Sequence, residues 1–171
     1  PGAGALVSNA FAASGPNSAN ITGPSDLTHI FSGMTSGIWI GTAKQYVPSS
    51  SSGTGTSYYI LMNQYAPGGP YSWSTELSYN LNAGTMQSDF GTTNTLPIVT
   101  DQWVPIRVEV NLDTNTVREF YNNQLVSTHG WYGAAQEVRA VDLYAGGAGP
   151  VYYDDIAWQR TAGVGFNTQS T

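Results

Sequence analysis

The chain contains no cysteine, so neither disulfides nor thiolate-bound metals can contribute to it. Charge is also scarce, because only 9% of the 171 residues are Asp, Glu, Lys or Arg. Five basic residues against eleven acidic ones give a net charge of −6, which opposes binding to nucleic acid or to an anionic membrane surface. No apolar run approaches the roughly 20 residues of a membrane span. We therefore expect neither nucleic-acid binding nor membrane insertion.

The first seven residues are too few and too uncharged for a signal peptide, so we expect a mature or excised segment. Low charge, many small polar residues and the absence of thiols favour a secreted or extracellular location. Stability is then expected to come from packing, with an oxygen-ligated ion as a further source.

Residues 103–111 show the clearest periodicity in the chain. Val104, Ile106, Val108 and Val110 alternate with polar or charged residues such as Arg107. Side chains of a strand point to opposite faces in turn, so this alternation predicts a strand with one buried face.

The residues that follow predict four more strands without an intervening helix. Residues 116–121 and 124–128 flank Asn122 and Asn123, which tolerate positive φ and predict a tight hairpin. Residues 138–145 and 151–158 flank the Gly-rich turn 146–150. Five consecutive antiparallel strands indicate a meander or Greek-key sheet.

The N-terminal half shows shorter runs of the same kind. Strands are predicted at residues 5–7, 19–22, 27–32, 38–47, 57–64, 73–80 and 85–89. About a dozen short strands predict one all-β domain over residues 1–171, a two-sheet antiparallel jelly-roll sandwich, with an irregular tail at residues 161–171.

Five segments can be compared with known families, at residues 15–21, 103–110, 120–126, 141–144 and 151–156. They resemble the concanavalin A-like, laminin G-like jelly rolls of secreted bacterial proteins, and the resemblance covers residues 5–160. It implies a jelly-roll fold and favours glycan binding, and it carries over no catalytic set. Such proteins commonly begin with an extra strand bearing a Phe-acidic motif, which does not precede Pro1 here. An unfilled sheet edge invites strand addition, so self-association through sheet edges is a rival expectation.

Aromatic residues in loops are the main candidates for ligand contact. They are Tyr65, Tyr71 and Trp73 around the loop 67–70, and Trp131 with Tyr132 in a second loop. Flat sugar faces stack on such rings while polar side chains bind hydroxyl groups. Burial in the core or against another subunit is the alternative for each.

No catalytic motif is recognisable, and we expect a non-enzyme. Glycosidases of this fold class need two carboxyl groups on either side of one bond. Asn111 stands where the Glu-x-Asp-x-x-Glu run of sandwich glucanases has its middle carboxylate. Glu76 and Glu109 remain a candidate pair, with solvated charges partnered by Arg107 as the plainer interpretation. His29 and His129 are expected to be structural or solvated.

Asp154 and Asp155 are the candidate metal ligands. Successive strand residues point to opposite faces, so one of the two should face the core and need a partner. A structural calcium is one such partner, because calcium accepts carboxylate and carbonyl oxygens. Hydrogen bonds to backbone groups, or contacts with Arg139 or Arg160, are the alternative.

Taken together, the sequence predicts a secreted, non-catalytic module that binds a glycan or polysaccharide. A structural or adhesive subunit that assembles through open sheet edges is the first alternative. A glycan-cleaving enzyme is the second.

Overall fold

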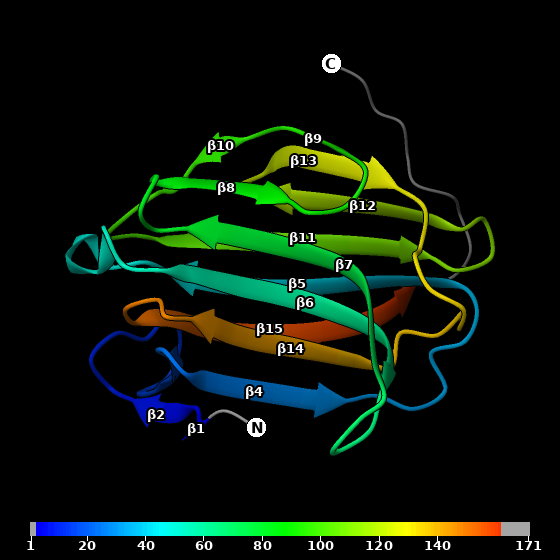
Figure 1. Ribbon diagram of the computed structural model, residues 1–171, viewed down its shortest axis with the longest axis horizontal. Helices are drawn as coiled ribbons and strands as arrows, with labels where there is room; N and C mark the ends of the chain where they lie inside the picture. Colours follow the sequence, from blue (N-terminus) through cyan, green and yellow to red (C-terminus); the bar gives the residue numbers. More distant parts are fainter. Residues whose placement is uncertain (1–2, 162–171) are drawn as a thin grey trace.

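The computed structural model describes residues 3–161, and almost all of its regular structure is β-strand (Figure 1). The elements are β1 (Ala3–Gly4), β2 (Leu6–Ser8), β3 (Ser18–Ile21), β4 (Ser25–Ile30), β5 (Ile38–Tyr46), η1 (Ser49–Ser51, a 3-10 turn), β6 (Thr56–Tyr65), β7 (Tyr71–Asn80), β8 (Thr85–Ser88), β9 (Thr92–Thr93), β10 (Leu96–Pro97), β11 (Trp103–Asn111), β12 (Thr116–Tyr121), β13 (Gln124–His129), β14 (Ala140–Gly146) and β15 (Val151–Thr161). The predicted all-β class is confirmed.

Two sheets pack face to face, as the sequence predicts. The seven-stranded sheet has the order β1-β4-β14-β6-β7-β8-β10, and the eight-stranded sheet has the order β2-β3-β15-β5-β11-β12-β13-β9. Neighbouring strands are antiparallel throughout, except that β1 runs parallel to β4. The short strands β1, β9 and β10 lie at sheet edges and were not predicted.

β11 is a strand with one buried face, as its alternating sequence predicts. Val104, Ile106, Val108 and Val110 are buried in the core between the sheets. The hairpin β12–β13 closes through Asn122 and Asn123, whose φ angles are 48° and 63°. Asparagine reaches this region more readily than other residues with a Cβ, which explains the position of the turn.

The five C-terminal strands do not form one sheet, which differs from the meander or Greek-key sheet predicted for them. β11, β12 and β13 are consecutive neighbours in the eight-stranded sheet, but β14 lies between β4 and β6 in the other sheet. β15 then returns to the eight-stranded sheet, between β3 and β5. The Gly-rich turn 146–150 therefore crosses between sheets instead of closing a hairpin.

A second, smaller apolar cluster lies outside the main core. Ile60, Met62 and Ala140 alternate along their strands with core residues such as Leu61 and Val141, so they point away from the eight-stranded sheet. The seven-stranded sheet is consequently apolar on part of both faces. β15 continues to Thr161, and the rest of the predicted irregular tail lies outside the described residues. Within residues 3–161 no helix is long and apolar enough to cross a membrane.

Candidate functional site

The exposed side of the seven-stranded sheet, here called the outer face, brings together side chains from four central strands. The strand register arranges these side chains in three rows that cross β4, β14, β6 and β7 in that order. The rows are Asp26, Tyr144, Tyr58 and Ser78; Thr28, Asp142, Ile60 and Glu76; and Ile30, Ala140, Met62 and Trp73. Figure 1 shows these four strands side by side. The face therefore has aromatic side chains toward both ends and carboxyl groups between them.

The floor of the outer face is apolar and well covered. Ile60, Met62 and Ala140 are 4%, 3% and 0% exposed although they point away from the core, and Tyr58 and Tyr65 pack against them. Beside this floor, β6, β7 and β8 enclose a polar pocket of about 200 Å³. Tyr58, Asn80, Thr85 and other polar residues such as Gln87 line it. The face is thus hollowed, with hydrogen-bonding groups in the hollow.

The structure brings together three of the predicted ligand-binding aromatics. The rings of Tyr65 and Tyr71 lie 5.5 Å apart, and Trp73 stands opposite Met62 on the same hairpin. Tyr71 and Trp73 are 47% and 44% exposed. These residues form an exposed aromatic surface at one end of the outer face.

A second aromatic pair on the outer face was not predicted. Tyr58 and Tyr144 are stacked with centroids 5.9 Å apart and ring planes 24° apart. They are 86 residues apart in the sequence (144 − 58), but their strands β6 and β14 are neighbours in the sheet. Alternation indicated that each residue lies in a strand, but the sequence holds no signal that the two strands pair.

The two aromatic residues predicted in the second loop, Trp131 and Tyr132, differ in burial. Trp131 is only 6% exposed, belongs to the core, and donates its Nε1–H to the Ala135 carbonyl. Its prediction as a ligand contact is therefore wrong. Tyr132 is exposed and packs against Phe90 with ring centroids 4.9 Å apart. Asn63 holds its backbone by donating to the Tyr132 carbonyl at 3.1 Å.

Carboxyl groups on the outer face lie close enough to one another to resist ionisation. Burial, a hydrogen bond with Asp89 and the charge of Asp89 raise the pKa of Glu76 to about 8. Burial, followed by the hydrogen bond and charge of Asp26, raises the pKa of Asp142 well above its usual range. No Lys or Arg points outward from the four central strands of this sheet among residues 3–161. No neighbouring cation offsets the rise in the pKa of Glu76 or of Asp142.

The predicted pairing of Glu76 with Glu109 is wrong. Glu76 belongs to β7 on the outer face of one sheet, whereas Glu109 lies on the opposite surface of the molecule, in β11. Glu109 bonds there to Arg107 and, at 3.2 Å, to Arg118. The predicted partner Arg107 is therefore confirmed, but Glu109 is only 4% exposed and is not the solvated charge of the plainer interpretation.

Asp154 and Asp155 do not follow the simple alternation expected of them. A bulge lies between Asp154 and Ala157, and Asp155 has a φ of 50°, so neither carboxylate enters the core. Asp154 accepts hydrogen bonds from the backbone N–H groups of residues 13 and 14, and Asp155 pairs with Lys44 at 2.9 Å. Backbone bonding was predicted, but the cation is not one of the two predicted arginines. Residues 3–161 contain no group of three His or acidic residues able to hold a metal.

His129 belongs to a buried polar cluster between the sheets. Its Nε2 lies 3.2 Å from the Thr75 hydroxyl and 3.4 Å from Glu119 Oε2, and the Thr75 hydroxyl also bonds to Glu119. Burial alone would lower the pKa of His129. The hydrogen bonds of His129 to Glu119 and to the Gly130 carbonyl, together with the negative charge of Glu119, outweigh burial, so the pKa is raised. The cluster joins β7 to β12 and β13, which supports the structural role predicted for this histidine.

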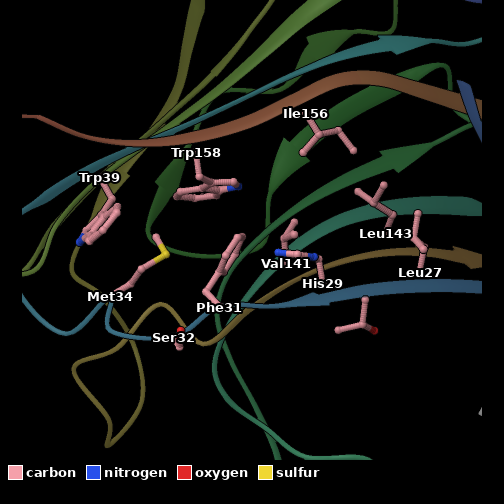
Figure 2. A pocket seen from close by; sticks show the side chains of 11 residues that line it. Leu27, His29, Phe31, Ser32, Met34, Trp39, Val141, Leu143, Ile156 and Trp158 are labelled. Carbon is pink, nitrogen blue, oxygen red and sulfur yellow. The ribbon is translucent and has the colours of Figure 1, made fainter.

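A cleft of about 630 Å³ opens between the sheets at the edge formed by β4 and β15 (Figure 2). Trp39, Trp158 and Met34 line one end, while Leu27 and Ile156 line the other. His29 also lines the cleft, with its ring 5.0 Å from that of Phe31. The cleft is mainly apolar and contains no pair of carboxyl groups.

No family model and no curated protein matches the chain. Solved structures do match it in fold. A carbohydrate-binding module, CBM66 from Bacillus subtilis, aligns with a TM-score of 0.58 and 8% identity over 93% of this chain and 94% of its own. Sheep galectin-11, in complex with glycerol, aligns with a TM-score of 0.52 and 14% identity over 80% and 97%. Trypanosoma rangeli sialidase, in complex with sialic acid, aligns with a TM-score of 0.62 and 14% identity over 92% and 28%.

Another sialidase matches with a TM-score of 0.61 and 7% identity, and the chain spans only 15% of its length. All of these identities are low, so the likeness concerns the β-sandwich fold. It agrees with the concanavalin A-like architecture that the sequence resembles.

Proposed function

We propose that the chain is an extracellular, non-catalytic module that binds carbohydrate on the outer face of the seven-stranded sheet. The observation that carries this proposal is the combination of exposed aromatic rings and buried apolar floor with a polar pocket on a single face. Carbohydrates present both apolar C–H faces and many hydroxyl groups, so they match a surface of this kind. The low charge, with only 9% of residues charged, supports the extracellular setting.

In this proposal, the two ends of the face contribute differently to binding. Tyr71 and Trp73 offer exposed ring surface on which a sugar can stack. Ser78, Gln87 and Asp89 offer donors and acceptors around the polar pocket, where Ser78 already donates to Asp89 at 2.9 Å. The fold neighbours include a protein described as a carbohydrate-binding module and a galectin, which supports the choice of ligand class.

Binding to a panel of neutral and charged polysaccharides, measured by affinity electrophoresis and then by calorimetry with the best ligand, tests the proposal. Trp73→Ala should weaken binding by about five-fold or more, because stacking of one flat ring on an aromatic side chain contributes on the order of 1–3 kcal/mol in nucleic-acid recognition. Leu125→Ala is the matched control, since Leu125 is 41% exposed on β13 of the other sheet. Failure of every polysaccharide to bind, or equal binding by Trp73→Ala, would refute the proposal.

A glycan-cleaving activity is the second candidate, and one observation favours it. Asp142 and Glu76 lie on either side of Ile60 in the strand register, on the same face, and both have raised pKa values. A protonated carboxyl group on this face is suited to act as a general acid. Release of reducing ends from a bound polysaccharide, abolished in Glu76→Gln and Asp142→Asn, would establish it. Absence of product from every ligand that binds would leave the non-catalytic proposal standing.

A structural calcium also remains a proposal. Asp155 pairs with Lys44 and accepts a hydrogen bond from the Ser14 hydroxyl, and it keeps 34% of its side chain exposed. A calcium-dependent rise in the unfolding temperature that Asp155→Asn removes would support a site there.

A further inference from the structure

The edge of the molecule formed by β4 and β15 has unpaired backbone in both sheets. β1 pairs only with Ser25 and Asp26 of β4, so Leu27–Ile30 has no strand on that side within residues 3–161. β3 pairs only with Val151–Tyr153 of β15, and the segment Ala157–Thr161 pairs with β5 alone among the described residues. Unpaired N–H and C=O groups along two edges are a template for strand pairing.

Apolar surface is concentrated along the same edge. The cleft of about 630 Å³ between the sheets meets a second cavity of about 390 Å³, and both are lined by Leu27 and Ile156. Leu6 and Val7 line the second cavity and are 61% and 79% exposed. A contiguous apolar edge of this kind marks an interaction surface more often than a solvated one.

Charge along the edge indicates which partner fits. Arg160 is the one of the five Lys and Arg residues with no carboxylate within ion-pair distance in the described part of the chain. It lies toward one end of the open segment Ala157–Thr161. Just before the other end lie Asp155, which pairs with Lys44, and Asp154, which has no Lys or Arg within ion-pair distance among the described residues. Two copies of β15 laid antiparallel therefore bring each arginine toward Asp154 of the other copy. The edge is complementary to itself, as an isologous interface requires.

We propose that the β4–β15 edge is the site where two copies of this chain associate about a two-fold axis. β15 pairs antiparallel with β15 of the second copy, which extends the eight-stranded sheet across the dimer. The paired strands cover the open side of the cleft shown in Figure 2, and Ile156 and Leu27 become buried. This inference does not depend on the proposed glycan site, which lies on the outer face of the other sheet.

Size-exclusion chromatography with light scattering over a wide range of protein concentration tests the proposal. The mass should rise from 18.2 kDa to twice that value as concentration increases. Ile156→Lys places a charge in the interface and should raise the dissociation constant at least ten-fold. Arg160→Glu should also raise the dissociation constant, because it places a negative charge near Asp154 of the other copy. Leu125→Lys, an equally exposed strand residue on β13, should leave the dissociation constant unchanged.

Single cysteine variants give a second measurement that does not depend on weak equilibria. The chain contains no cysteine, so one cysteine introduced at exposed Ala157 reports only intermolecular contact. Under mild oxidation Ala157→Cys should form a covalent dimer, whereas Leu125→Cys should not. Circular dichroism should confirm that each variant keeps the native β spectrum. A constant mass of 18.2 kDa, or oligomers unaffected by Ile156→Lys and Arg160→Glu, would overturn the proposal.

Discussion

The pKa values of Glu76 and Asp142 lie above the usual range of carboxyl groups, because burial and a neighbouring acid both oppose their ionisation. A group with a raised pKa in the folded state adds stability below its unfolded pKa and loses that contribution as pH rises through the folded value. For Glu76 this window extends from about 4.5 to about 8. His129 acts in the same direction, since its pKa is raised above 6.5.

We therefore predict that the unfolding temperature falls as pH increases from about 5 to 9, and that Glu76→Gln makes the curve flatter. Glutamine does not titrate, so folding of the variant no longer involves the proton that Glu76 binds more tightly in the folded state than in the unfolded state. Differential scanning calorimetry across this range measures the slope. Glu137→Gln is the control, because Glu137 lies off the outer face and pairs with Arg139 at 3.6 Å. A Glu76→Gln curve parallel to the native one would contradict the prediction.

At the scale of elements, the pairing of β5 with β15 depends on a close approach between Gly41 and Trp158. The two residues are opposite each other in the register, and a Cβ at position 41 would overlap the Trp158 ring. Gly41→Ala should thus lower the free energy of unfolding by about 1–3 kcal/mol, the usual cost of forcing extra volume into a packed region. Urea denaturation measures the loss. Gly4→Ala, where a Cβ meets nothing within 4 Å, should have no such effect.

Local patterns predicted most elements correctly, because alternation and turn residues act over a few positions. The faces of β11 and the turn at Asn122 and Asn123 are examples. The division of strands between sheets depends on contacts between residues far apart in the sequence, so it was not predictable for β14 and β15. Alternation also failed at the bulge after Asp154, where one extra residue turns the chain.

The candidate site shows the same contrast between contacts within one hairpin, which the sequence predicts, and contacts between distant strands, which it does not. Tyr65, Tyr71 and Trp73 belong to one hairpin, and the sequence placed them together. Tyr58 and Tyr144 meet only because β6 pairs with β14, a non-local contact that no short pattern encodes. For Trp131 the position in a loop suggested an exposed ring, but the ring packs into the main core.

At the scale of the whole molecule, the proposed glycan site and the proposed dimer edge occupy different surfaces. The two-fold axis that relates antiparallel strands of one sheet is perpendicular to that sheet. A dimer formed through β15 therefore presents both outer faces on the same side. Two sites on one side can engage a single polysaccharide chain, and the second binding event then becomes intramolecular.

The dimer should for this reason bind a long polysaccharide more tightly than a short oligosaccharide, by about ten-fold or more. Ile156→Lys should remove this difference while leaving affinity for the oligosaccharide unchanged, because Ile156 lies on the β15 edge and not on the outer face. Trp73→Ala should weaken binding of both ligands and leave the dimer intact. Calorimetry with the two ligand lengths, on protein held above its dissociation constant, separates these effects. Equal affinity of the native protein for both lengths would show that the two sites cannot reach one chain.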